Sequence, residues 1–243
     1  YEIQMSLFTY NHADNVWELE CESEVSRIQY DCYEEHLFEV DGILYYTAVN
    51  PDEDSPLLEL RAYNRHTNHW SQCTHLYFDK PIDRSATLSC GSHIYFLTST
   101  EVHRYDPKQY RWCRQTPPMN ISDICTAVAM GTEIFCTDFD FTQTMVYDTD
   151  LDCWHKLQGW QNRGNLDVSF RPNFFLLENQ LHISFKVYDT VQQRGLDILV
   201  YVYDRSADAW RDTKATLPNN NILHTYGSQL PVARLYLPYL NRA

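Results

Sequence analysis

The sequence predicts an all-β fold in which one four-stranded unit is repeated five times. A tyrosine is followed by a tryptophan seven residues later at five places: Tyr10 with Trp17, Tyr63 with Trp70, Tyr105 with Trp112, Tyr147 with Trp154, and Tyr203 with Trp210. Segments rich in β-branched and aromatic residues precede the later pairs, as strands do. No stretch keeps a 3.6-residue period, so we expect minimal helix.

Each tyrosine–tryptophan pair predicts a β-hairpin. The residue after every tyrosine is Asn or Asp, whose short side chain bonds the backbone two residues on and so starts a turn. These turn residues are Asn11, Asn64, Asp106, Asp148 and Asp204. Successive tyrosines lie 42 to 56 residues apart, which is the spacing of four-stranded propeller blades.

Two further strands precede each of the later hairpins. Their clearest segments are Ile43–Val49, Ile94–Thr98, Ile134–Thr137 and Leu181–Phe185. Three of these segments follow a glycine (Gly42, Gly91 and Gly131) and the fourth follows Asn179, so each is entered through a tight turn. The pattern predicts a β-propeller of five blades, with a sixth, degenerate blade as the alternative.

The first repeat is incomplete, because only nine residues precede Tyr10. The apolar stretches Thr225–Leu230 and Val232–Leu240 are candidates for the missing strands. We therefore expect residues 1–243 to form one domain whose ring is closed by strands from both termini.

The charge balance bears on the choice of partner. The chain has 19 basic and 33 acidic residues and a formal charge of −14, which disfavours nucleic acid and anionic membranes. No apolar run is long enough to span a bilayer, and we expect a soluble, cytoplasmic protein. The eight cysteines form no C-x-x-C pair, so we expect buried, reduced thiols.

Catalytic signatures are missing from the sequence. There is no phosphate-binding glycine loop, no H-E-x-x-H and no G-x-S-x-G, and we predict a protein without enzymatic activity or cofactor. The nearest approach to a metal-ligand cluster is His66, His69, Cys73 and His75. Because they flank a hairpin turn, we expect a solvated turn rather than a metal site.

The repeat resembles the Kelch repeat over nearly the whole chain. The resemblance rests on the tyrosine with Asp or Asn, the tryptophan seven residues after the tyrosine, and an apolar-proline ending such as Thr116–Met119 or Leu217-Pro218. The usual Gly-Gly doublet after the second strand is replaced, for example by Thr98-Ser99. With only seven glycines, the chain is most similar to the divergent propellers of the Kelch repeat and BTB domain-containing family.

This resemblance implies a role in ubiquitination. In that family an amino-terminal BTB domain binds cullin-3 and dimerises, while the propeller captures a protein substrate. The chain would then be the carboxy-terminal part of a longer protein that also has BTB and BACK domains. Two alternatives remain open: a Kelch scaffold or cytoskeleton-binding module without a ligase role, and a propeller enzyme with His, Tyr and carboxylates around the central channel.

The resemblance also implies that substrate contacts lie in loops at one face of the propeller. The residues predicted to contact a substrate protein are Trp160, Arg84, Arg171, Arg163, Arg27, Tyr188 and Phe141. Trp160 is the one tryptophan outside the repeat, and exposed Trp and Arg often anchor interfaces. Against this, Trp160 folding back onto the ring and the arginines pairing with nearby carboxylates stay open.

Overall fold

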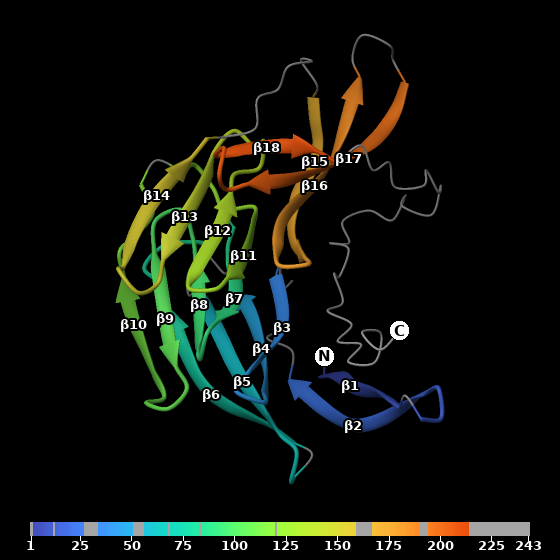
Figure 1. Cartoon of the computed structure of the whole chain (residues 1–243). Coiled ribbons are helices and arrows are strands. Elements are labelled where there is room, and N and C mark those ends of the chain that lie inside the picture. Colours follow the sequence, from blue (N-terminus) through green and yellow to red (C-terminus); the bar gives the residue numbers. More distant parts are fainter. Residues whose placement is uncertain are drawn as a thin grey trace. The chain divides into compact units, whose positions relative to one another are not determined.

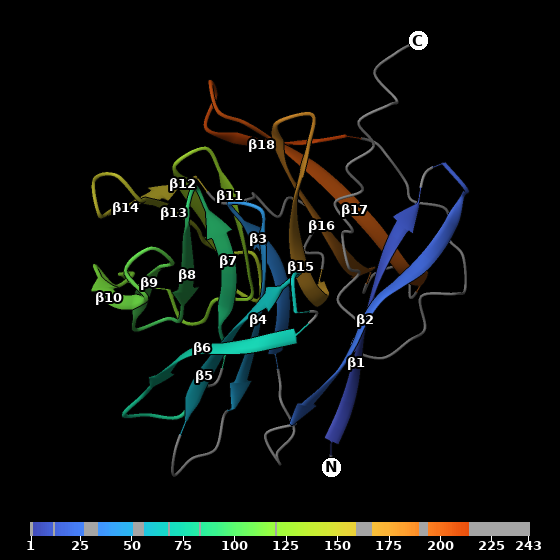
Figure 2. The same ribbon diagram turned by 90° about the horizontal axis from the view of Figure 1, so that it is seen from below.

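A computed structural model describes residues 2–11, 13–26, 34–50, 56–67, 69–82, 84–119, 121–158, 167–189 and 194–213. Every regular element in these ranges is a β-strand, so the all-β prediction is confirmed for them (Figures 1 and 2). The same ranges contain no helical segment with the length and hydropathy of a membrane span. The chain divides into two units, Tyr1–Gly159 and Trp160–Ala243, each described by itself below.

The first unit contains three four-stranded antiparallel sheets and one two-stranded sheet. The two-stranded sheet pairs β1 (Glu2–Asn11) with β2 (Val16–Ser26). The first four-stranded sheet has β3 (Glu34–Val40), β4 (Ile43–Asn50), β5 (Leu57–Asn64) and β6 (His69–Tyr77). The next has β7 (Ala86–Cys90), β8 (His93–Leu97), β9 (Val102–Asp106) and β10 (Arg111–Gln115). The last has β11 (Thr126–Met130), β12 (Glu133–Thr137), β13 (Thr144–Asp148) and β14 (Cys153–Leu157).

The second unit contains one described sheet of the same kind. Its strands are β15 (Asp167–Leu177), β16 (Gln180–Asp189), β17 (Arg194–Asp204) and β18 (Ala209–Asp212). In all four four-stranded sheets each strand pairs with its neighbours in chain order. Within the first unit the opening strands of successive sheets also touch, β3 with β7 and β7 with β11 (Figure 1).

The predicted hairpins are confirmed in all five repeats. Each repeat tyrosine lies directly opposite its tryptophan in an antiparallel ladder. Each following Asn or Asp uses Oδ1 to accept the N–H groups of the residues two and three positions on, as Asp106 does from Lys108 and Gln109 at 2.8 and 3.2 Å. The short polar side chain therefore closes the turn that the sequence predicts.

A left-handed residue completes four of these turns. Two positions before the tryptophan, the backbone φ is +56° at Asn15, +52° at Tyr110, +50° at Asp152 and +46° at Asp208. The equivalent Asn68 lies outside the described residues. Asn and Asp tolerate this conformation because their side chains bond locally, whereas Tyr110 adopts it at a cost in strain.

The tight turns before the second strands are confirmed as well. Each joins its strands through two residues, since Val40 pairs with Ile43, Cys90 with His93, Met130 with Glu133 and Leu177 with Gln180. Gly91 and Gly131 have φ of +57° and +65°. In the β15–β16 turn both Glu178 (+50°) and Asn179 (+58°) are left-handed.

The core of the first unit lies between successive sheets. Trp112 of β10 packs against Leu60 of the preceding sheet, together with Ile94 and Tyr105. Trp154 packs in the same way against the cluster that holds Leu97 of its preceding sheet. These two tryptophans therefore lie where neighbouring sheets face each other, as the repeat predicts.

Trp17 departs from that expectation. Its side chain is 63 % exposed, and Phe8 and Leu19, which pair across β1 and β2, are exposed beside it. The repeat predicts that each of its tryptophans is buried between neighbouring sheets. The exposure of Trp17 contradicts this for the first repeat, whose described strands form a sheet of two strands rather than four.

Several strands are longer than the sequence indicated. The sequence led us to expect loops at about residues 22–31 and 158–171, but β2 continues to Ser26 and β15 begins at Asp167. The segments predicted to close the ring, Thr225–Leu230 and Val232–Leu240, lie outside the described residues.

Candidate functional site

The topology places two kinds of connection at one edge of each sheet. In a four-stranded antiparallel meander, the second strand ends and the third begins at the edge where the first begins and the fourth ends. The connections β8–β9 and β12–β13 therefore share an edge with the segments β6–β7 and β10–β11 that join successive sheets. By edge we mean the end of the sheet at which its strands begin or end, and we call this end the loop edge. The tyrosine–tryptophan turns lie at the opposite edge.

Arg84 joins three of these connections. It precedes β7, and its Nη1 lies 3.2 Å from Oδ2 of Asp123, which precedes β11. Its guanidinium carbon lies 4.5 Å from the ring centroid of Phe139, in the β12–β13 connection. The other carboxylate oxygen of Asp123 accepts the Phe139 N–H at 3.2 Å. Three chain segments are thus held together by one cation, one carboxylate and one aromatic ring.

The Arg84 side chain is partly exposed. Nη1 is itself buried and forms an ion pair with Asp123 but no well-aligned hydrogen bond, while about a third of the whole side chain is exposed. A guanidinium has five N–H donors in a planar fork that matches a carboxylate or phosphate. The arrangement is suited to binding an anionic group of a partner.

The β12–β13 connection is held by the Asp138 carboxylate. Oδ1 of Asp138 accepts the N–H groups of Thr142 and Gln143 at 2.7 and 3.1 Å, and Oδ2 accepts the Thr142 hydroxyl. Asp138 is only 5 % exposed, so these bonds also satisfy a buried charge. The loop that carries Phe139 is consequently built as a fixed platform rather than an open coil.

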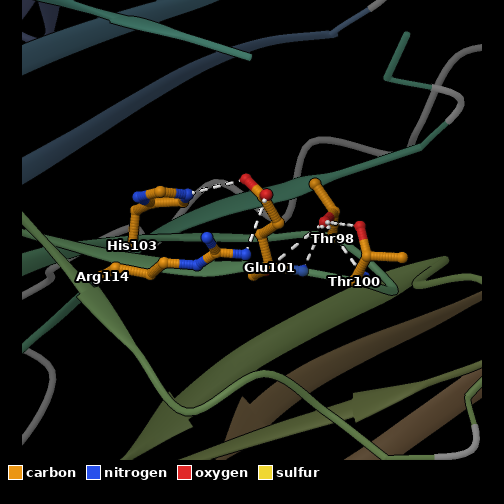
Figure 3. A network of polar contacts seen from close by, with 5 residues as sticks. All are labelled: Thr98, Thr100, Glu101, His103 and Arg114. Atoms are coloured by element: carbon orange, nitrogen blue, oxygen red, sulfur yellow. Dashed lines mark hydrogen bonds and ion pairs between the residues drawn. The ribbon is translucent and has the colours of Figure 1, made fainter. Parts of the chain in front are cut away.

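A second polar network lies at the same edge, in the β8–β9 connection (Figure 3). Thr98 Oγ1 accepts the N–H groups of Thr100 and Glu101 at 3.2 and 2.9 Å. The Glu101 carboxylate lies between an imidazole and a guanidinium, with Oε2 2.9 Å from His103 Nε2 and Oε1 3.1 Å from Arg114 Nη2. Thr98 and Asp138 therefore have equivalent roles in successive sheets. The side chain of each accepts backbone N–H groups of the connection that follows it.

A pairing of glutamate with a basic side chain recurs in the preceding sheet. Oε1 of Glu59 lies 2.6 Å from Nε of Arg61, and both side chains are largely buried. Glu59 and Glu101 each stand four residues before a repeat tyrosine, and Arg61 and His103 stand two before it. Residues two apart on a strand share a face, which brings each pair together. The repeat thus places charge near the loop edge of two sheets.

This edge presents residue types that are common in protein interfaces. In the part of the chain that the structure describes, no three His, Cys, Asp or Glu side chains gather as metal ligands. Arg84 offers a charged donor and Phe139 an aromatic surface, both held by sheet-anchored loops. These are the residue types that anchor protein interfaces.

The predicted contact residues differ in their exposure and in whether the structure describes them. Arg84 lies at the loop edge, about a third of its side chain is exposed, and it pairs with a carboxylate. Phe141 is only 1 % exposed, so its side chain forms part of the β12–β13 loop core and not of the surface. Arg171 and Tyr188 belong to β15 and β16, and nothing is described of their side chains. Arg27, Trp160 and Arg163 lie outside the described residues.

Sequence reasoning missed the partners of Arg84. Asp123 and Phe139 are distant in sequence and only the packing of successive sheets unites them. Thr98 and Asp138 carried a usable signal, since each ends a second strand in the turn-capping residue class. A glutamate four residues and an arginine or histidine two residues before the repeat tyrosine were a second such signal.

No protein-family model and no curated protein matches this chain.

Proposed function

We propose that the chain is a five-bladed Kelch-type β-propeller that serves as the substrate-recognition domain of a cullin-3 ubiquitin ligase adaptor. In this proposal residues 1–243 form one cytoplasmic domain, closed by strands from both termini. BTB and BACK domains of a longer protein would bind cullin-3 and dimerise. The support is the repeated four-stranded meander and the Kelch-like residues within it.

One observation carries the binding role. Arg84, Asp123 and Phe139 bring three connections together at one edge of two successive sheets. A recognition surface needs side chains whose positions are fixed before the partner arrives, because ordering them on binding costs affinity. The Asp138-capped loop and the Arg84 ion pair supply that preorganisation.

The first experiment tests binding at this edge. Arg84→Ala and Phe139→Ala variants of the chain are used to capture proteins from cell lysate, beside wild type. Arg65→Ala is the matched control, because Arg65 is an exposed arginine in the β5–β6 turn at the opposite edge. We expect at least one captured protein to be lost with Arg84→Ala and kept with Arg65→Ala, while thermal midpoints stay within a few degrees of wild type. Equal capture by all variants contradicts the proposed site.

The second experiment tests the ligase role. The full-length protein carrying Arg84→Ala is expressed in cells, and ubiquitination of the captured partner is followed. We expect less ubiquitin on that partner and a longer lifetime than with wild type. A partner that binds through Arg84 but whose ubiquitination does not change would instead support the scaffold or cytoskeletal alternative.

A further inference from the structure

A thiol and an imidazole meet on the last strand of the first unit. Cys153 and His155 flank Trp154 on β14, and residues two apart on a strand point to the same side. The distance from Cys153 Sγ to His155 Nε2 is 3.4 Å. His155 is exposed and Cys153 half-exposed, so the pair is open to small molecules from solution.

The strand that carries this pair is fixed on its other side. Trp154 Nε1 donates a 2.8 Å hydrogen bond to the Thr116 carbonyl, and Asp152 accepts the Thr116 N–H at 2.9 Å. The two residues next to Cys153 in the sequence are therefore both anchored to the segment after β10. This anchoring fixes the backbone that carries the thiol and the imidazole.

Three other described cysteines lie in environments that suppress thiol chemistry. Burial raises the pKa of the Cys73, Cys90 and Cys136 thiols. Cys136 is fully buried, and the Cys90 thiol lies 3.4 Å from the Gly131 carbonyl oxygen, to which it donates. Because the thiolate is the nucleophile, a thiol that is buried and hard to ionise reacts slowly.

Cys113 provides the closest comparison. It follows Trp112 on β10, and Arg111 Nη2 donates to its sulfur at 3.4 Å. The fourth strands of the two sheets thus each carry a tryptophan between a cysteine and a basic residue, but in opposite order. The two sequences are Arg111-Trp112-Cys113 and Cys153-Trp154-His155. The difference is chemical, since an arginine cannot accept a proton and a neutral imidazole can.

We propose that Cys153 is a site of covalent modification by α,β-unsaturated carbonyl compounds, with His155 as its proton acceptor. His155 Nε2 takes the thiol proton, and Sγ forms a bond to the β-carbon of the electrophile. The π pair of the carbon–carbon double bond moves onto the α-carbon, which is protonated by the imidazolium or by water. The addition has no leaving group and needs no oxidant or reductant.

The test uses N-ethylmaleimide as the electrophile on the whole chain. The protein is labelled for short times below one equivalent per thiol, quenched, digested, and each cysteine is quantified by mass spectrometry. The same labelling in denaturant gives the reference rate for every site. We expect the labelling rate of Cys153, divided by its rate in denaturant, to be the highest among Cys73, Cys90, Cys113, Cys136 and Cys153. This comparison uses the wild-type protein alone.

A matched pair of variants tests the imidazole. His155→Gln keeps a polar side chain of similar size but removes the proton acceptor, and we expect it to slow Cys153 about tenfold or more, in line with the effect of a positioned base. Arg111→Gln, the control on the neighbouring outer strand, is expected to leave Cys153 unchanged. The proposal is overturned if Cys113 reacts as fast as Cys153 in the folded wild type. It is equally overturned if His155→Gln, folded by tryptophan fluorescence, labels Cys153 at the wild-type rate.

Discussion

The hydroxyl of Tyr147 donates a 2.6 Å hydrogen bond to Oδ1 of Asp152, five residues further on in the β13–β14 hairpin. The same oxygen accepts the backbone N–H of Thr116, from the segment that follows β10, at 2.9 Å. Partial burial acts to raise the pKa of Asp152, but the bonds from Tyr147 and Thr116 outweigh it and the pKa is lowered. One ionised carboxylate therefore ties two neighbouring sheets together, and Tyr203 with Asp208 repeats the hairpin part of this contact at 2.7 Å.

This relationship predicts a dependence of stability on pH. An aspartate ordinarily titrates at about pH 3.9, and a lower pKa in the folded chain stabilises the fold above that value. The contribution is lost as the pH falls through the lower, folded pKa. We therefore expect the stability advantage of wild type over Asp152→Asn to be full at about pH 6 and to shrink below about pH 4.

Urea unfolding followed by tryptophan fluorescence at several pH values measures this difference. Asp150→Asn is the control, since Asp150 is an exposed carboxylate of the same turn whose backbone N–H alone takes part in the turn bonds described. Parallel stability curves for wild type and Asp152→Asn from neutral to acid pH would contradict the prediction.

The repeat tryptophans differ in what they contribute. Trp154→Phe keeps an aromatic ring in the inter-sheet core but removes the 2.8 Å hydrogen bond to the Thr116 carbonyl. We expect a loss of about 0.5 to 1.5 kcal/mol in the free energy of unfolding, the usual net contribution of one hydrogen bond, because Thr116 is exposed and water can replace the lost donor. Trp17→Phe is expected to change it by less than about 0.5 kcal/mol, since Trp17 is 63 % exposed. Urea midpoints at constant m-value check both variants, and equal losses would contradict the predicted difference between the two positions.

Two tight turns predict effects of opposite sign from the same backbone physics. A Cβ at Gly131 would meet nothing within 4 Å, so Gly131→Ala introduces left-handed strain without a clash and is expected to cost about 1 kcal/mol. Glu178 already adopts φ +50° in the β15–β16 turn. Because Asn tolerates that conformation better, Glu178→Asn is expected to stabilise by a few tenths to about 1 kcal/mol. Thermal unfolding of both variants measures the two signs, and a stabilising Gly131→Ala would contradict the assignment.

The hairpins could be predicted because their information is local. A tyrosine, its Asx residue and a tryptophan seven positions later lie within one turn, so each fixes its partner without help from the rest of the chain. The second strands were equally readable, because Gly91 and Gly131 mark turns whose backbone favours glycine. Strand lengths were not, since β2 and β15 extend through residues that also suit loops.

The candidate site was predictable only in part, because its information is not local. Arg84 was predicted from the resemblance to the Kelch repeat, but Asp123 and Phe139 reach it from other connections only after two sheets pack. Exposure was equally hidden. Phe141 is an aromatic residue in a loop, as many contact residues are. The neighbouring sequence does not indicate that the bonds to Asp138 fold this loop so that the Phe141 ring is buried.

Phe141 separates a structural role from a binding role. Its ring is 1 % exposed and its φ is +53°, so the Asp138-capped loop holds it in a strained backbone conformation. We expect Phe141→Ala to lower the free energy of unfolding by about 3 to 5 kcal/mol, the usual cost of emptying a buried aromatic site. Phe141→Gly loses the same ring but relieves the backbone, so its loss of stability should be no greater than that of Phe141→Ala and up to about 1 kcal/mol smaller.

Partner capture at a temperature where both variants remain folded is expected to match wild type, in contrast to Arg84→Ala. Capture that is lost while urea midpoints stay at the wild-type value would instead make Phe141 a contact residue, and would mean that the β12–β13 loop opens when a partner binds.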